Sequence, residues 1–162
     1  MKQKETILSL DTATTTGYSI YKNNEIKYSG VWKFSKNDKT KKLIQFYETL
    51  CKTIEKYHIS TVVAEDIFFD EGKPKALLAL GAMRGIIQLV CAQYQIKLAD
   101  FIEPVDHKYL LTGNLYANKS QTVKAINELG YQVKDDNEAD AISIMLAHLQ
   151  LNKLPIIHPV QA

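Results

Sequence analysis

The sequence predicts an α/β fold with a mixed five-stranded sheet flanked by helices, in which the first three strands are antiparallel and the later ones parallel. Three short runs at 6–11, 17–22 and 25–32 are rich in aromatic and β-branched residues, which indicates sequential strands. From residue 43 onward, helical periodicity alternates with short apolar runs. That alternation is typical of parallel strands joined by helices.

A turn at Asn23 and Asn24 is expected to join the second and third runs as a hairpin. The polar connection "FSKNDKTKK" leads into a helix in which Leu43, Phe46 and Leu50 recur at helical spacing. The segment "STVVAEDIFF" follows as a short strand. "KPKALLALGAMRGIIQLVCAQY" is predicted to be a long helix that is buried on most of its surface.

The last third of the chain is expected to hold one more strand and two helices. "IKLADFIEP" is predicted to be a strand closed by Pro104, and the helices are "NKSQTVKAINELG" and "DDNEADAISIMLAHLQ". The sequence contains no repeat and no internal linker, so we predict one domain over residues 1–162. Its short tail, from about 153 to 162, either covers a partner subunit or is mobile.

The composition is that of a soluble globular protein. Of 162 residues, 46% are hydrophobic and 23% are charged, with a net charge of +2. This small excess excludes a histone-like binder, but it leaves room for a local basic patch. Cys51 and Cys91 are expected to be reduced core thiols. No run approaches the roughly 20 apolar residues of a membrane span, and the start does not resemble a signal peptide, so we expect a cytoplasmic protein.

Three acidic residues interrupt apolar patterns at the ends of predicted elements. Asp11 ends the first strand, Glu65 ends the fourth, and Asp140 lies in the first turns of the last helix. Any one of them alone is explained as a helix cap or a solvated strand end. Because functional groups gather at the carboxyl ends of strands, the three together predict a site for a hard cation such as Mg²⁺ or Mn²⁺.

The last helix adds neighbours to this site. Residues three and four apart share a helix face, so Asp136 and Asn137 are expected on the side of Asp140. Glu138 is expected to point away into solvent.

Five segments together resemble one known family. They are the strand–Asp–strand opening, "VVAEDIFF", "ALLALGAMRGIIQLV", "ANKSQTVKAI" and "NEADAISIMLAH". From about Ile7 to His148, their order and spacing resemble the RuvC-type Holliday-junction resolvases, which have the RNase H-like fold. The resemblance implies a homodimeric endonuclease that makes paired nicks in four-way DNA junctions during recombination and repair. It also implies two Mg²⁺ ions per active site, for which Mn²⁺ can substitute.

The resemblance assigns roles to the acidic residues. Asp11 matches the carboxylate that bridges both metals, and Glu65 and Asp140 match further ligands. The family usually has Asp or His three residues before the last ligand, where this chain has Asn137. Because an amide oxygen is a poorer ligand than a carboxylate, both Asp136 and Asn137 stay open as the fourth ligand.

Other residues match family positions that contact DNA or the second subunit. Lys108 and Lys119 match two lysines near the scissile phosphate. Phe68 matches an aromatic residue that stacks on a base near the junction centre. The helix that resembles the family's dimer interface contains Gly81, Arg84 and Gly85.

The predicted reaction is two-metal-ion hydrolysis of a phosphodiester, which leaves a 5′-phosphate and a 3′-hydroxyl. DNA affinity should come mainly from phosphate contacts. The candidate lysines are Lys36, Lys39, Lys41, Lys42, Lys73 and Lys75. Alternation along the chain suggests that Phe68 faces out and Phe69 faces the core. His107 is interpreted as a hydrogen-bonded surface histidine, with a part in proton transfer or product release as the alternative.

Three other functions compete with this interpretation. The opening "DTATTTGYSIY" also resembles the phosphate-binding hairpin of actin-like ATPases and sugar kinases, but those proteins need two such domains. The chain could instead be another RNase H-like nuclease that acts on RNA or flapped DNA. Asn137 leaves room for a non-catalytic junction-binding protein. The sequence leaves open the preferred cleavage sequence, the range of branched substrates and the need for a branch-migration motor.

Overall fold

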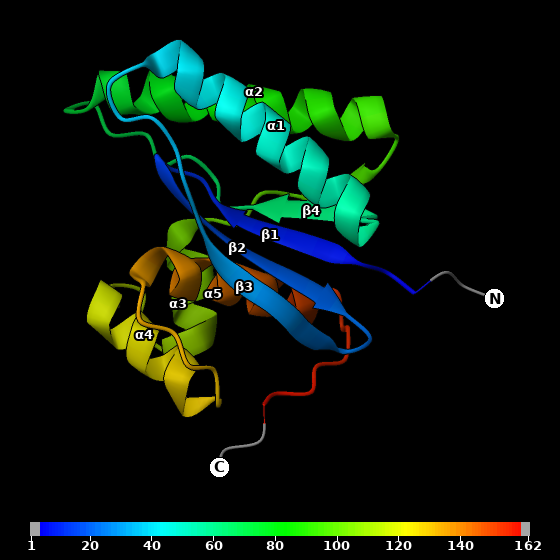
Figure 1. Ribbon diagram of the computed structural model, residues 1–162. Helices are drawn as coiled ribbons and strands as arrows, with labels where there is room; N and C mark the ends of the chain where they lie inside the picture. Colours follow the sequence, from blue (N-terminus) through cyan, green and yellow to red (C-terminus); the bar gives the residue numbers. More distant parts are fainter. Residues whose placement is uncertain (1–3, 160–162) are drawn as a thin grey trace.

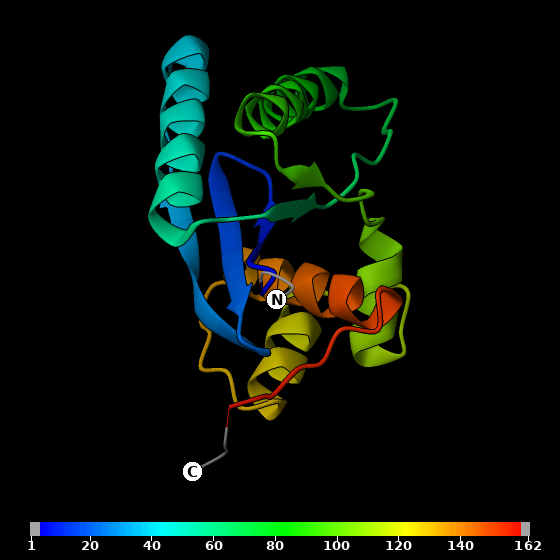
Figure 2. The same cartoon turned by 90° about the vertical axis from the view of Figure 1, so that its right-hand side faces the viewer.

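The computed structural model describes residues 4–159 and has a five-stranded sheet with helices on both faces (Figure 1). The strands are β1 (Ile7–Asp11), β2 (Thr15–Lys22), β3 (Glu25–Lys33), β4 (Thr61–Ala64) and β5 (Lys97–Leu98). The helices are α1 (Lys39–Tyr57), α2 (Pro74–Tyr94), α3 (Pro104–Thr112), α4 (Lys119–Glu128) and α5 (Asp136–Leu151). α1 and α2 cover one face of the sheet, and α3, α4 and α5 lie on the other (Figures 1 and 2).

The sheet has the strand order β3-β2-β1-β4-β5. β2 pairs antiparallel with both β1 and β3, whereas β4 pairs in parallel with both β1 and β5. The mixed sheet predicted from the sequence is therefore confirmed. Asn23 and Asn24 form the β2–β3 turn with φ angles of 56° and 66°, the left-handed conformation that a tight hairpin requires.

Alternating side chains of the central strands build two cores. Leu8, Leu10 and Val62 point toward α1 and α2, where they pack with Phe46 and Ile87. Their neighbours Ile7 and Val63 point to the opposite face and pack against Ile144 and Met145 of α5. The central strands are buried on both faces, as is typical of a sheet between two helical layers.

The segment after β4 contains one helix, α3, that the sequence did not predict. β5 spans only Lys97–Leu98, with a further isolated bridge between Glu65 and Ile102, and a new helix, α3, begins at Pro104. Proline lacks an N–H and has a fixed φ, so it suits the first turn of a helix as well as the end of a strand. The prediction used only the second property, and it missed α3 for that reason.

The predicted burial of α2 is wrong. Met83, Ile87, Val90 and Cys91 are buried on one side, but only 22% of its most apolar stretch is buried. Within residues 4–159, α2 is also the one helix long and apolar enough to span a membrane by length and composition, contrary to expectation. Leu78 and Leu89 of this helix are exposed.

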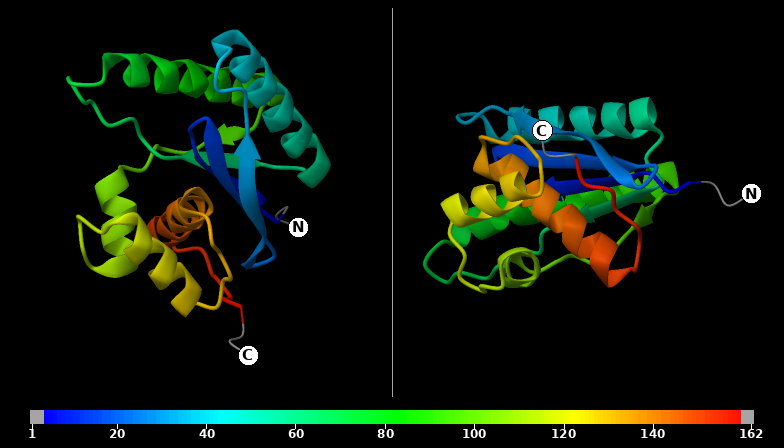
Figure 3. Two further views of the ribbon diagram at one scale, coloured as in Figure 1. Left: turned by 60° about the vertical axis from the view of Figure 1, so that its left-hand side comes forward. Right: turned by 90° about the horizontal axis from the view of Figure 1, so that it is seen from below.

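The described part of the C-terminal tail, residues 153–159, packs on its own chain. The Ile157 N–H donates to the Asn24 carbonyl (2.6 Å), and the Tyr21 hydroxyl donates to the Pro155 carbonyl (2.6 Å). Figure 3 shows the tail running from the end of α5 past the β2–β3 turn. Residues 160–162 of the predicted tail lie outside the described residues. Of the two free thiols, Cys91 is buried as expected, but Cys51 is only half-buried.

Candidate active site

Asp11 and Glu65 lie at the same edge of the sheet. Asp11 is the last residue of β1, and Glu65 follows the last residue of β4, the neighbouring parallel strand. The Glu65 N–H donates to the Leu10 carbonyl at 3.2 Å, which aligns the two strand ends. The sequence-based expectation that these acids occupy adjacent carboxyl ends is therefore confirmed as a matter of geometry.

α5 crosses this edge at very close range. The Ser9 hydroxyl donates to the Ala141 carbonyl at 2.7 Å and shares a 2.6 Å hydrogen bond with Ser19. Gly17, which pairs with Asp11 across β1 and β2, lies against the start of α5. A Cβ at Gly17 would be 1.8 Å from the Asn137 carbonyl oxygen. Small and hydroxyl-bearing residues of the sheet thus allow α5 to bring its acids to the Asp11 edge.

Burial and neighbouring acids raise the pKa values of Asp11 and Asp140. The pKa of Asp11 lies well above its usual value because of burial and of repulsion from Glu65, Asp140 and Asp136. Burial also raises the pKa of Asp140 to about 6, and Glu65 and Asp136 add to the shift. His107 opposes the shift of Asp140, and Lys108 opposes both shifts. The site therefore holds more negative charge than its own lysine compensates.

A divalent cation would supply the missing positive charge. Carboxylate oxygens are the donors that hard ions such as Mg²⁺ prefer, so the chemistry of the donor set fits a metal. Within residues 4–159, no three His, Cys, Asp or Glu side chains already form a group that could hold an ion. Glu65 and Asp136 are instead bound to the side chains of His107 and Lys119.

The two lysines predicted near the scissile phosphate both reach the site. Lys108 lies on α3, and its charge lowers the pKa of Asp11 and of Asp140 against the larger upward effects. Lys119 begins α4, and its Nζ lies 2.7 Å from the Asp136 carboxylate. Lys119 is therefore held by an ion pair and is not free in this state.

Glu138 is not the solvated acid that the helical pattern suggested. Its Oε1 accepts a hydrogen bond from the Ser29 hydroxyl of β3 at 2.7 Å. The Glu138 side chain points away from Asp140, as expected. It points toward the sheet, however, and not into solvent. The helix starts at the Asp135 cap, whose carboxylate accepts from the N–H groups of Asn137 and Glu138.

His107 is the residue at this site that the sequence did not predict correctly. It is fully buried and not at the surface. Its Nε2 lies 2.6 Å from Oε2 of Glu65, and its Nδ1 lies 2.8 Å from the Ser143 hydroxyl. Because α3 was not foreseen, the helix face that carries His107 could not be assigned from the sequence.

The loop after β4 exposes both of its aromatic residues. Phe68 is 74% exposed and Phe69 is 64% exposed. The prediction that Phe69 faces the core is wrong, because the segment is not a strand and alternation does not apply to it. Among the candidate DNA-binding lysines, Lys42 is half-buried and the others are exposed, namely Lys36, Lys39, Lys41, Lys73 and Lys75.

Comparison with known proteins identifies the family. The family model described as crossover junction endodeoxyribonuclease RuvC matches residues 7–148. The chain belongs to the RuvC family. A RuvC of Helicobacter hepaticus is 31% identical over 164 residues, which cover 94% of this chain and 86% of that protein. A RuvC of Caldicellulosiruptor saccharolyticus is 29% identical over 153 residues, covering 88% of this chain and 91% of the relative.

The fold agrees with this membership. The structure of Thermus thermophilus RuvC in complex with a Holliday junction substrate superposes with a TM-score of 0.79. The superposition covers 92% of this chain and 95% of that one at 16% sequence identity. The RNase H-like fold and the RuvC-type resemblance expected from the sequence are thereby confirmed.

Proposed function

We propose that this protein is a metal-dependent endonuclease that resolves four-way DNA junctions by paired nicks. The observation that carries this function is the meeting of Asp11, Glu65 and Asp140 at one sheet edge of a RuvC-type fold. The curated relatives are crossover junction endodeoxyribonucleases, and the Thermus thermophilus RuvC was solved with a Holliday junction. The rival ATP-binding function has no comparable support.

In this proposal, Asp11, Glu65 and Asp140 hold two Mg²⁺ ions, with Mn²⁺ as a substitute. When bound, such ions supply an activated water and stabilise the leaving 3′ oxygen, so the products carry a 5′-phosphate and a 3′-hydroxyl. Asp136 takes the fourth place, because a carboxylate adds charge that the Asn137 amide lacks. Lys119 would then leave Asp136 and bind the scissile phosphate. Lys108, on α3, would lie near the negative charge of the same phosphate.

DNA is held by the exposed residues around this edge. Phe68 and Phe69 present two free aromatic faces on the loop that leaves Glu65, and either can stack on an unpaired base. Lys39, Lys42 and Lys75 line a groove between α1 and α2 and would contact phosphates. Lys36, Lys41 and Lys73 extend this basic surface.

A second copy of the chain would cover the exposed side of α2. Leu78 and Leu89 are 74% and 54% exposed, and Gly81 and Gly85 have open space beside them. Residues 78, 81, 85 and 89 lie on one helix face, and Arg84 at its border pairs with Asp66 beside Glu65. A homodimer would place two sites on one junction. A DNA substrate also favours a cytoplasmic location. In that location, the exposed apolar side of α2 would pack against a partner subunit and not against a membrane.

The deciding experiment is cleavage of a labelled synthetic four-way junction with Mg²⁺ or Mn²⁺, comparing the wild-type protein with Asp11→Asn. We expect symmetrical nicks from the wild type and none from the variant, which should still bind the junction. Three-way, flapped, linear and RNA substrates test the other nuclease functions, and ATP turnover tests the kinase-like one. Equal nicking by both proteins would show that the acidic edge is not the active site.

Asp136→Ala and Asn137→Ala separate the two candidates for the fourth ligand. If Asp136 is the ligand, its removal should raise the metal concentration needed for nicking more than removal of Asn137. The opposite order would assign the position to Asn137.

A further inference from the structure

We propose that His107 is a positioning residue that fixes the Glu65 carboxylate for metal binding. The inference rests on the proposed function, because it takes Glu65 as a metal ligand. It concerns His107 of α3 and Ser143 of α5, neither of which the sequence analysis linked to metal binding. His107 would act through Glu65 and would not touch DNA or the reacting phosphate.

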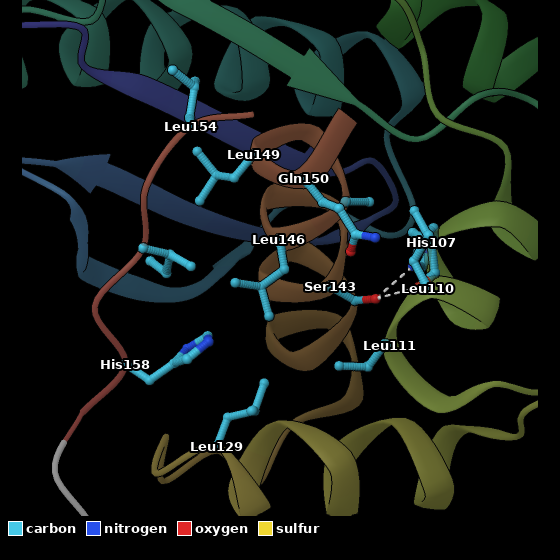
Figure 4. A pocket seen from close by; sticks show the side chains of 12 residues that line it. His107, Leu110, Leu111, Leu129, Ser143, Leu146, Leu149, Gln150, Leu154 and His158 are labelled. Atoms are coloured by element: carbon cyan, nitrogen blue, oxygen red, sulfur yellow. Dashed lines mark hydrogen bonds between the residues drawn. The ribbon is translucent and has the colours of Figure 1, made fainter. Parts of the chain in front are cut away.

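The first support is geometric. His107 is fully buried, and its ring lies between a strand end and a helix, with Nε2 2.6 Å from Glu65 Oε2 and Nδ1 2.8 Å from Ser143 Oγ. Ser143 is itself buried on α5, three residues after Asp140. Figure 4 shows the His107 and Ser143 side chains pointing toward each other from their two helices. One ring thus connects α3, α5 and the end of β4.

The second support is the direction of the hydrogen bonds. An ionised carboxylate only accepts, so the 2.6 Å contact requires a proton on Nε2 of His107. The Ser143 hydroxyl lies 2.8 Å from Nδ1 and 3.2 Å from the His107 carbonyl oxygen, where it can donate to either acceptor. The Glu65 carboxylate therefore selects the ring form that carries a proton on Nε2. In the neutral ring, the Ser143 hydroxyl donates to Nδ1 and satisfies the second nitrogen.

The third support is what this bond does to Glu65. A glutamate side chain loses rotamer entropy when it is ordered. The His107 bond restrains Oε2 before any metal arrives, and among residues 4–159 Oε1 has no hydrogen-bond partner. One oxygen is thus held by the protein while the other is available to a cation. Partners of this kind orient metal-binding carboxylates and change metal affinity by about 10–100-fold when they are removed.

The surroundings of His107 argue against a role in packing alone. A cavity of about 400 Å³ lies beside it and is lined mostly by apolar side chains, including Leu110, Leu111 and Leu146 (Figure 4). An apolar residue at position 107 would find apolar neighbours there. The imidazole instead costs the burial of two polar nitrogens, both of which are satisfied by specific partners. The hydrogen bonds of the imidazole, more than its volume, explain why position 107 is a histidine.

The test compares His107→Leu, His107→Gln and Ser143→Ala in the full-length protein. Mn²⁺ binding is measured without DNA by electron paramagnetic resonance, and junction nicking is measured across a range of Mn²⁺ concentrations. We expect His107→Leu to weaken Mn²⁺ binding about 10–100-fold and to shift the nicking curve equally, with most of the rate regained at saturating metal. His107→Gln should restore most of the affinity, because its amide N–H₂ can donate to Glu65. Ser143→Ala should cause a smaller shift.

His58→Gln is the matched control, because His58 is exposed at the C-terminal cap of α1, and it should behave as wild type. Wild-type Mn²⁺ affinity in both His107→Leu and Ser143→Ala would overturn the inference, as would equal losses in His107→Leu and His107→Gln. If His107→Leu does not fold, His107→Gln and Ser143→Ala decide by the same criteria. Failure of the proposed function looks different, because the wild type itself would then not nick the junction, or Glu65→Gln would leave both Mn²⁺ binding and nicking unchanged.

Discussion

The Lys119 ammonium group lies 2.7 Å from the Asp136 carboxylate, and this ion pair joins the first turn of α4 to the first turn of α5. The hydrogen bond between them raises the pKa of Lys119 and lowers the pKa of Asp136. Both groups therefore stay charged and paired at neutral pH. A metal ion that binds Asp136 must compete with this lysine, and a phosphate that binds Lys119 must compete with this acid.

The first prediction follows from that competition. Lys119→Met should slow nicking about 10²-fold, because a cation near the scissile phosphate is lost. Mn²⁺ binding without DNA should become no weaker, because Asp136 is released. Single-turnover cleavage and Mn²⁺ titration measure the two effects. Lys124→Met, on the same helix, is the control and should change neither. Weaker Mn²⁺ binding in Lys119→Met would contradict this account.

The second prediction concerns stability and pH. The raised pKa of Asp140, about 6 against an ordinary 3.8, means that the folded protein binds a proton more tightly than the unfolded chain does. The metal-free protein should therefore lose stability as the pH rises from about 4 to 6, and stay less stable above that range. Asp140→Asn should abolish cleavage yet raise the melting temperature at pH 7.5. The difference should shrink near pH 4.5, and Mg²⁺ should stabilise the wild type more than the variant.

Thermal melts at several pH values, with and without Mg²⁺, provide the measurement. A variant that is less stable than wild type at pH 7.5 without metal would be inconsistent with the repulsion inferred at this site.

The third prediction concerns the Gly17 contact with α5. Gly17→Ala would put a methyl group 1.8 Å from the Asn137 carbonyl oxygen, so the start of α5 must move. We expect a loss of about 1–3 kcal/mol in the free energy of unfolding, and a larger relative loss of nicking because Asp140 moves too. Denaturant unfolding and junction cleavage test this. Gly72→Ala, where the nearest atom is 3.2 Å away on the Asp70 side chain, should be close to neutral.

The fourth prediction concerns DNA affinity. Lys39→Ala and Lys75→Ala should each weaken junction binding and flatten its salt dependence, by about 0.9 in the slope of log K against log salt for each lost phosphate contact. Fluorescence anisotropy at several salt concentrations measures the slope. Lys97→Ala, at the start of β5 and the opposite end of the sheet, should leave the slope unchanged. If the slope is unchanged in both groove variants, this groove does not contact DNA phosphates.

The fifth prediction concerns assembly. Leu78→Glu and Leu89→Glu introduce charge on the exposed apolar side of α2, and either should convert a dimer to a monomer in analytical ultracentrifugation. The Leu89→Glu monomer should bind a junction but lose paired nicking, whereas Leu78→Glu should also weaken junction binding, because Leu78 lines the groove that contains Lys39 and Lys75. Leu151→Glu, which alters another exposed leucine at the end of α5, should stay dimeric. If both α2 variants remain dimeric, the dimer interface does not lie on this side of α2.

The sequence by itself determined the family, the mixed sheet and the placement of the three acids. Local rules were enough for these features. The Asn23–Asn24 turn needs left-handed backbone, and acids at the ends of adjacent parallel strands must meet at one edge. Asp136 and Asp140 of the last helix were likewise placed near each other by helical spacing alone.

Only the tertiary structure decided which surfaces face each other. The apolar residues of α2 are spread around the helix, so the side that stays exposed depends on α1 and the sheet, not on its own pattern. Phe69 and Glu138 were misplaced because a loop has no alternation and because β3 came within reach of α5. His107 reached Glu65 because Pro104 starts a helix, although a strand end satisfies proline equally well. Periodicity records which residues are apolar, whereas burial and hydrogen bonding depend on the partners that the fold supplies.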